Sequence, residues 1–137
     1  MTTRRVCIDH LTLPVADLEV SQAFYSAVFA ALGWSEERVE GLPTWGPPGA
    51  EDFSIAEGAP PPGGMHIAFL ADDRDGVEAF HAAGLAAGGR DNGQPGLRPQ
   101  YHEGYYGAFL LDPDGNNVEA VLHEQPHDSQ AALVSPA

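Results

Sequence analysis

Two stretches of the chain show the same order of hydrophobic patterns, a short apolar run followed by apolar positions at helical spacing. In the first stretch, the run from Val6 to Val15 is rich in branched side chains and predicts a strand. Asp17 then predicts a helix N-cap, and apolar residues recur at helical spacing from Val20 onward. Gly33 marks the expected end of this helix.

The second stretch repeats this order, with a strand over 65–71, an N-cap at Asp73 and a helix that ends at Gly88 and Gly89. When the sequence is slid along itself so that His10 falls on His66, further identities align without a gap. They include the pairs Asp17 with Asp73, Phe24 with Phe80, and Gly33 with Gly89. Such internal similarity indicates that the chain contains one module twice.

Three short strand-like segments follow each predicted helix, and glycine and proline residues separate them. The segments are 34–39, 43–46 and 52–56 in the first half, and 97–101, 105–111 and 117–123 in the second. The turn DPDGNN joins the last two. We therefore expect one α+β domain over 1–137. Its parts are module one at 6–57, a linker GAPPPGG at 58–64, module two at 65–124, and a tail without periodicity at 125–137.

Strand alternation predicts which side chains leave the core. His10 and Thr12 share the face opposite Leu11, and the helix of the module must cover the apolar face. His10 therefore lies on the open face, and by the repeat His66 takes the same place in the second module. In the last strand, Glu119 lies opposite the apolar positions.

These three residues predict a metal site if a two-fold axis relates the modules and their sheets curl together, because His10, His66 and Glu119 then converge in one cup. Two imidazoles and one carboxylate, with open positions for water and substrate, form the facial triad that suits non-haem Fe(II). The same donors also suit Mn, Zn or Ni. We expect one divalent ion per site.

The composition excludes several classes of partner. The formal net charge of −14, with no lysine, disfavours binding to nucleic acid and to anionic membranes. The sequence has no apolar run near the roughly 20 residues that a membrane helix needs, and its first residues do not resemble a signal peptide. The single cysteine, Cys7, has no partner for an internal disulfide. We expect a cytoplasmic protein.

The opening DHLTLPVADLEVSQAFY, the second opening MHIAF and the ending FLLDPDGNNVEAV resemble the vicinal oxygen chelate superfamily. This superfamily includes glyoxalases, extradiol dioxygenases, fosfomycin-resistance enzymes and bleomycin-binding proteins. The resemblance covers the chain from about Val6 to His123 and implies a glyoxalase-like fold. It also implies metal ligands in the first strand of each module and in the last strand, which are the positions of His10, His66 and Glu119.

Departures from the branches of the superfamily leave the reaction open. Glyoxalase-like enzymes have a fourth ligand, a carboxylate, on the final strand of module one, and its place here falls near Asp52 or Phe53. Extradiol dioxygenases have a tyrosine where this chain has Phe109, and they usually have four modules. Fosfomycin-resistance enzymes match in ligand set, and Thr12 resembles their substrate-contacting threonine, but a phosphonate needs several cations. A bleomycin-like binder suits the acidic charge but needs no metal ligands.

The segment RPQYHEGYYGAF, from Arg98 to Phe109, leads into the expected cup. Counting back from Glu119 through the turn places Phe109, Gly107 and Tyr105 on the metal side of a strand, with Tyr106 opposite. His102 is a candidate general acid or base, because an imidazole titrates near neutral pH. The candidate catalytic residues are therefore His102 and Tyr105, and the candidate substrate-binding residues are Thr12, Trp45 and Phe109. Packing in the core is an equally good explanation for Trp45.

We expect two βαβββ modules that form a curled mixed-sheet cup, in a homodimer that covers the sheet edges. The expected activity is that of a divalent-metal enzyme acting on a small molecule whose oxygen atoms chelate the metal. Dioxygenase-like and lyase or isomerase-like reactions both remain open. The alternative is a metal-free binding or antibiotic-resistance protein of the bleomycin-binding type. The sequence also leaves open whether the cup forms within one chain or by exchange of modules between two.

Overall fold

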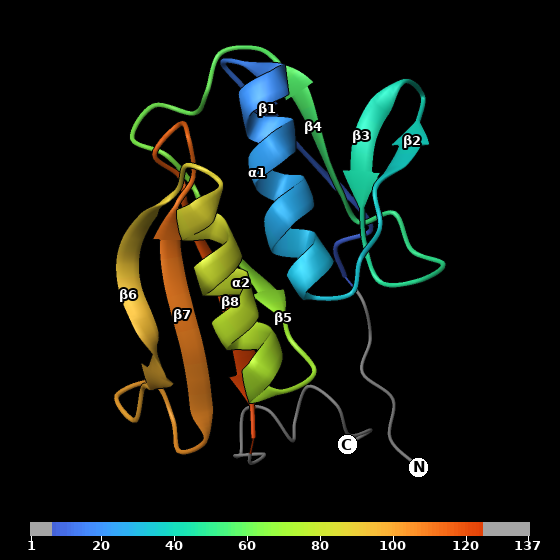
Figure 1. The fold of residues 1–137 in the computed structure, drawn as a ribbon. Helices are drawn as coiled ribbons and strands as arrows, with labels where there is room; N and C mark the ends of the chain where they lie inside the picture. Colours follow the sequence, from blue (N-terminus) through green and yellow to red (C-terminus); the bar gives the residue numbers. More distant parts are fainter. Residues whose placement is uncertain (1–6, 125–137) are drawn as a thin grey trace.

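The computed structural model describes residues 7–124, and the expected tail over 125–137 lies outside these residues. The chain runs through strand, helix and three strands, and then repeats that order (Figure 1). The first module consists of β1 (Leu11–Val15), α1 (Leu18–Ala31), β2 (Glu37–Val39), β3 (Leu42–Trp45) and β4 (Phe53–Glu57). The second consists of β5 (His66–Leu70), α2 (Arg74–Ala86), β6 (Arg90–Leu97), β7 (Tyr105–Leu111) and β8 (Asn117–His123).

Each module forms its own four-stranded mixed sheet. The strand orders are β1-β4-β3-β2 and β5-β8-β7-β6, which are the same order in the two halves. In each sheet the first strand pairs in parallel with the last, and the remaining pairs are antiparallel. The α+β class and the duplicated βαβββ module are confirmed. Within the described chain, the two sheets are separate and unclosed, as in a glyoxalase-like fold of two modules.

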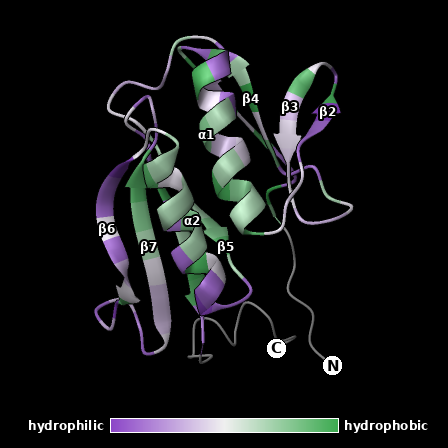
Figure 2. Ribbon diagram, viewed as in Figure 1, coloured by the Kyte–Doolittle hydropathy of each residue, from purple (hydrophilic) through white to green (hydrophobic). Residues whose placement is uncertain are grey.

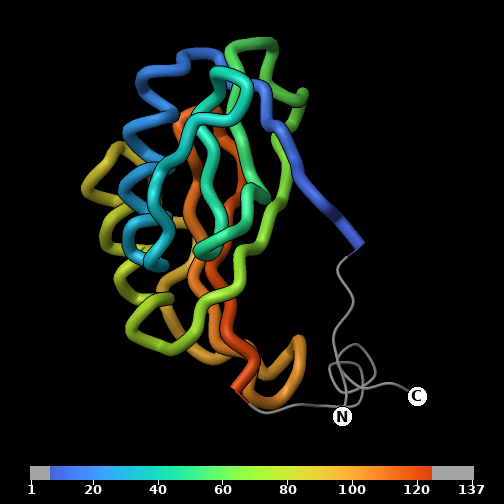
Figure 3. Tube along the Cα trace, turned by 90° about the vertical axis from the view of Figure 1, so that its right-hand side faces the viewer, coloured from blue at the N-terminus to red at the C-terminus, as the bar shows by residue number. Residues whose placement is uncertain are grey.

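The two helices lie side by side and contact each other (Figure 1). Figure 3 shows both helices on one side of the strands, so the sheet faces away from the helices are not covered by either helix. The core fills the space between the helices and the sheets. In Figure 2, β7 is hydrophobic in its upper part and pale in its lower part, while β6 is largely hydrophilic. Within residues 7–124, no helix is both long enough and apolar enough to cross a membrane.

The helix ends follow the expected signals. The Asp17 carboxylate accepts a hydrogen bond from the Val20 amide, and the Asp73 carboxylate accepts one from the Gly76 amide. Gly33 has a φ of 83° just after α1, a left-handed conformation that glycine adopts without strain. These local signals therefore fix both helix starts and the end of α1.

The strand before β7 differs from the expectation. The sequence predicts a strand over 97–101, whereas β6 runs from Arg90 to Leu97. Residues 90–97 are rich in glycine and polar side chains and include Pro95, a composition typical of a loop. They can form a strand because β6 lies at the edge of its sheet, where proline is tolerated. The register also shifts at Gly93 and Gly96, as at a β-bulge. The first strand is also shorter than the predicted run from Val6 to Val15. It starts at Leu11, which pairs with Phe53, the first residue of β4.

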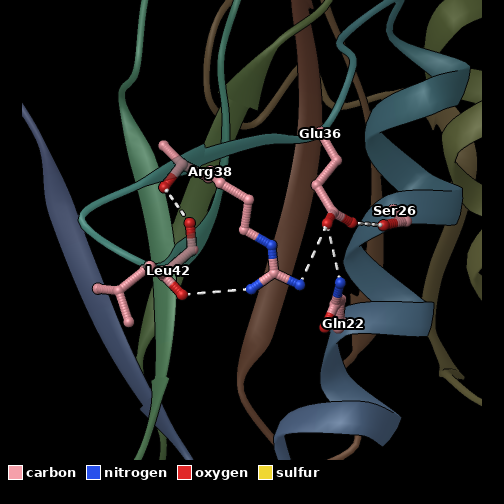
Figure 4. A network of polar contacts seen from close by, with 7 residues as sticks. Gln22, Ser26, Glu36, Arg38 and Leu42 are labelled. Atoms are coloured by element: carbon pink, nitrogen blue, oxygen red, sulfur yellow. Dashed lines mark hydrogen bonds and ion pairs between the residues drawn. The ribbon is translucent and has the colours of Figure 1, made fainter.

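Glu36, just before the β2–β3 hairpin, is hydrogen-bonded to two side chains of α1 (Figure 4). Its carboxylate accepts hydrogen bonds from Gln22 Nε2 at 2.8 Å and from Ser26 Oγ at 2.7 Å. Arg38 lies 3.9 Å from the same carboxylate and donates to the Gly41 carbonyl oxygen at 3.2 Å. This network links the edge of the first sheet, formed by β3 and β2, to α1.

Candidate metal centre and substrate pocket

His66 and Glu119 meet on the open face of the second sheet. Parallel pairing of β5 with β8 places Ala68 opposite Glu119, so that His66 and Glu119 lie diagonally across the two strands. His66 Nε2 is 2.8 Å from Glu119 Oε1. The Glu119 side chain is 1% exposed, while that of His66 is 55% exposed. A buried carboxylate needs polar partners, and the imidazole supplies one from the solvent side.

Tyr105 engages the other oxygen of the same carboxylate. Its hydroxyl donates a hydrogen bond to Glu119 Oε2. Burial, followed by the hydrogen bond with Glu119, raises the pKa of Tyr105 well above its ordinary value, so the phenol remains protonated as a donor. Gly107 leaves room for this contact, because a Cβ there would lie 3.3 Å from Glu119 Oε2 and 3.2 Å from Tyr105 Cε1.

Phe109 forms the adjoining apolar wall. It pairs directly with Glu119 across β7 and β8, and its ring centroid is 6.1 Å from that of His66. Tyr106 points to the other face, where its hydroxyl donates to Glu78. The alternation expected from the sequence, with Tyr105, Gly107 and Phe109 on the side of Glu119, is therefore present in the structure.

His10 precedes β1 on the first sheet and is exposed. Its Nδ1 lies 2.8 Å from the Asp9 carboxylate, which can only accept, so Nδ1 carries the proton. The lone pair of the neutral ring is then on Nε2. A histidine that donates one ring N–H to a carboxylate and offers the other nitrogen is the usual form of a metal-ligating imidazole.

The structure does not bring His10 to His66 and Glu119 within one chain. Among residues 7–124, no three His, Cys, Asp or Glu side chains are grouped closely enough to hold a metal ion. His10 instead lines a pocket of about 620 Å³ on the first sheet. The described residues of one chain therefore carry the donor set in two parts, with His10 beside the first sheet and His66 with Glu119 on the second.

The pocket on the first sheet is polar and acidic. Thr12 is exposed in it, and Thr44 Oγ1 lies 2.8 Å from Ser54 Oγ in the same wall. Four acidic residues also line it, namely Asp9, Glu40, Glu51 and Asp52. Such a lining favours polar ligands that carry no concentrated negative charge.

The register also tests the expected place of a fourth ligand. Phe53 and Ile55 face the core, at 2% and 0% exposure, so Asp52 and Ser54 take the open face. Thr12 pairs with Ser54 as Ala68 pairs with Glu119. The counterpart of Glu119 in module one is therefore Ser54, a hydroxyl residue, and Asp52 lies two residues before it, just ahead of β4. Asp52 still shares the pocket of His10.

The remaining candidates lie in different surroundings. Trp45 is 1% exposed and packs in the core against the rings of Phe29 and Phe53, so the core explanation describes its place. His102 lies beside Tyr105, with ring centroids 5.3 Å apart. Its Nε2 is 2.8 Å from His123 Nδ1, and its Nδ1 is 2.7 Å from the Glu103 carbonyl oxygen.

Sequence reasoning did not identify the roles of Gly107 and Ser54. A glycine in the middle of a predicted strand is a signal for close approach of another group, and that signal was available at Gly107. The place of Ser54 depends on the pairing register between β1 and β4. That register is a non-local property that periodicity in the sequence does not contain.

The chain has clear relatives. The model of the Glyoxalase/Bleomycin resistance protein/Dioxygenase superfamily matches residues 7–120. A glyoxalase/bleomycin resistance protein from Albidiferax ferrireducens T118 is 34% identical with a TM-score of 0.72, over 83% of this chain and 97% of that chain. A lactoylglutathione lyase from Agrobacterium tumefaciens is 22% identical with a TM-score of 0.61, over 86% of this chain and 94% of that chain. A glyoxalase-related enzyme from Fulvimarina pelagi is also 22% identical, with a TM-score of 0.64, over 86% and 88%. No curated protein sequence matches the chain.

Proposed function

The chain belongs to the glyoxalase/bleomycin resistance protein/dioxygenase superfamily, and from this premise we propose that it is a divalent-metal enzyme acting on a small molecule with chelating oxygens. The observation that carries the proposal is the pair His66 Nε2 and Glu119 Oε1, 2.8 Å apart on an open sheet face. This closeness of an imidazole nitrogen and a carboxylate oxygen supports a role as two adjacent ligands of one ion. Bound Fe, Mn, Zn or Ni would act there as a Lewis acid toward a substrate oxygen.

His10 is the third ligand in this proposal, and it comes from a second copy of the chain. The supporting observation is the division of the donors, with His66 and Glu119 on one sheet and His10 on the other. A two-fold dimer places the first sheet of one copy over the second sheet of the other and completes two equal sites. In this proposal the site forms between two chains, which is one of the two arrangements that the sequence leaves open.

Other residues of the chain have distinct roles in this site. Tyr105 holds Glu119 through its second oxygen and keeps a proton close to the reacting molecule. Phe109 forms an apolar wall beside His66, while Thr12 offers a hydroxyl from the opposing pocket. His102 contacts the ring of Tyr105 and serves as a nearby general acid or base.

Two reaction types fit this set of residues. Dioxygenase-like chemistry is supported by a two-histidine, one-carboxylate set with no carboxylate at the place of Ser54, because that set leaves positions for oxygen and substrate. Lyase or isomerase-like chemistry needs a base beside the substrate. Asp52, in the pocket of His10, is a carboxylate that can supply it. The identity of the bound metal separates the two, since iron favours the first.

A metal-free binding protein is the second candidate function. It is supported by the four carboxylates that line the pocket of about 620 Å³, which suit a cationic ligand. In that case His66 and Glu119 are an ordinary hydrogen-bonded pair. The two candidates therefore differ on Glu119, which is a metal ligand in the first and only a hydrogen-bond partner of His66 in the second.

Elemental analysis of the untagged protein, purified without oxygen, tests the proposal. We expect about one metal ion per chain in the wild type, and loss of most of it in His10→Ala, His66→Ala and Glu119→Gln, because each removes one of three ligands. Glu78→Gln is the matched control, since Glu78 accepts a hydrogen bond from Tyr106 on the other side of the sheet. Full metal content in Glu119→Gln, or none in the wild type after reconstitution, would favour the binding protein.

A further inference from the structure

Arg98 lies next to the open face of the second sheet. Its guanidinium carbon is 5.3 Å from the centroid of the Phe109 ring, and the same ring neighbours His66. The guanidinium thus belongs to the surroundings of the candidate metal centre.

Two glycines make room for this guanidinium. A Cβ at Gly93 would lie 3.3 Å from Arg98 Nη2 and 2.9 Å from Phe109 Cδ1, and a Cβ at Gly96 would lie 3.2 Å from Arg98 Nη1. The register of β6 shifts at both glycines. Arg98 Nη2 donates to the Gln94 carbonyl oxygen at 2.6 Å, which fixes the side chain in this position. The glycines of the bulged part of β6 therefore leave space that the Arg98 guanidinium occupies.

The charge of Arg98 has no carboxylate partner within residues 7–124. Its acceptors there are backbone carbonyls, those of Gln94 and Leu97. By contrast, Arg74 forms a salt bridge with Glu124, and Arg38 lies close to Glu36. In a chain of net charge −14, Arg98 is a positioned guanidinium without a carboxylate partner among the described residues. It retains donors for a ligand, because a guanidinium has five N–H groups.

We propose that Arg98 is the anion-binding residue of the substrate site and that the substrate is a monoanionic carboxylate with an apolar or aromatic body. A guanidinium matches the two oxygens of a carboxylate, and Phe109 offers the body a flat apolar wall. One cation balances one negative charge. A dianionic phosphonate needs more cations than this single guanidinium. The inference rests on the proposed function in one respect, namely that the other end of the substrate chelates the metal ion.

Calorimetric titration with two matched probes, 3,4-dihydroxybenzoate and 3,4-dihydroxybenzamide, tests this proposal. Both carry the same chelating hydroxyls, and they differ in the charge of the other end. We expect the wild type to bind the carboxylate at least about ten-fold more tightly than the amide, because a charged hydrogen-bonded pair is stronger than a neutral one. Arg98→Gln should bind the two probes equally. Arg90→Gln is the control, since Arg90 is exposed at the other end of β6 and should keep the preference.

The same titrations on metal-free protein and on Glu119→Gln separate this proposal from the proposed function. If the preference for the carboxylate remains without metal and is lost in Arg98→Gln, the anion site stands even when the metal assignment fails. If metal binds but the wild type shows no preference, or Arg98→Gln retains it, the assignment of Arg98 is wrong while the metal site stands. Failure of both probes to bind the wild type in either form also overturns it.

Discussion

Asp112 uses all the accepting capacity of its carboxylate while only 2% exposed. Oδ1 accepts from the amides of Asp114 and Asn116, at 2.9 and 2.8 Å. Oδ2 accepts from Asn116 Nδ2 at 2.9 Å and from the Tyr25 hydroxyl at 2.5 Å. Because Tyr25 is on α1 and Asp112 begins the turn between β7 and β8, this one residue connects the two modules.

Tyr25→Phe should lower the free energy of unfolding by about 1.5–3 kcal/mol at pH 8, the usual range for a lost hydrogen bond to a charged group. Burial, followed by the charge of Asp112, raises the pKa of Tyr25. The folded protein therefore keeps a proton that the unfolded chain loses above about pH 10. This contribution is complete below pH 10 and declines as the pH rises further.

Urea unfolding between pH 8 and pH 11, at one protein concentration, checks both parts. Tyr25→Phe should show a smaller decline of stability above pH 10 than the wild type. Tyr101→Phe is the control, because Tyr101 is 57% exposed. Equal stability of Tyr25→Phe and wild type at pH 8 would contradict the role given to the Tyr25 hydroxyl.

The contact between Tyr105 and Glu119 gives a second prediction at this scale. Tyr105→Phe removes the donor, and Gly107→Ala adds a Cβ 3.3 Å from Glu119 Oε2. We expect each change to weaken metal binding by about ten-fold or more, as changes behind a metal ligand typically do. Competition with a fluorescent chelator measures this affinity. Tyr106→Phe, on the other face, should bind metal as the wild type does.

The packing of α2 depends on a glycine in the middle of the helix. A Cβ at Gly84 would lie 2.2 Å from Leu110 Cδ1 on β7 and 3.1 Å from Val28 Cγ1 on α1. Both neighbours are fully buried, so neither side chain can move aside freely. The absence of a side chain at Gly84 is what allows α2 to lie close to α1 and to the second sheet.

Gly84→Ala should therefore lower the free energy of unfolding by about 1 kcal/mol. The gain in helix propensity is about 1 kcal/mol, and the cost of overpacking is about 1–3 kcal/mol. Ala82→Gly, at an exposed position of the same helix, calibrates the propensity alone and should cost about 1 kcal/mol. A Gly84→Ala protein more stable than the wild type would show that the core accepts the methyl group.

Local signals predicted the elements better than composition did. Asp17, Asp73 and Gly33 determine helix ends through hydrogen bonds and φ angles that depend on near neighbours only. The strand β6 was misplaced, because glycine and proline suggest a loop unless the strand is known to lie at a sheet edge and to carry bulges. Which strand lies at an edge is decided by pairing across the whole chain.

The candidate site divides in the same way. Alternation along β7 and β8 was enough to place Tyr105, Phe109 and Glu119 on one face. The relation of His10 to that face depends on how the two sheets are placed, and no periodicity in the sequence specifies it. The fourth-ligand position also required the register, which gives Ser54 rather than Asp52 as the counterpart of Glu119.

At the scale of the whole molecule, the proposed site divides between two chains. In each chain the helices occupy one side of the strands (Figure 3). His10 lies beside the first sheet, and His66 and Glu119 lie on the second. A dimer that joins them uses His10 from one copy and His66 with Glu119 from the other. A chain that lacks His10 and a chain that lacks His66 should then compensate for each other.

Mixed dimers test this arrangement. When His10→Ala and His66→Ala chains carry different tags and the mixed dimer is purified, one of its two centres is intact, so we expect about half the metal content of the wild type. The control pairs His66→Ala with Glu119→Gln. These two residues belong to the same half-site, so each centre of that mixed dimer lacks a ligand and we expect almost no metal. A His10→Ala and His66→Ala mixture with no more metal than its parents would place all three ligands of each centre in one chain, and the sheets would then have to close on each other when the metal binds.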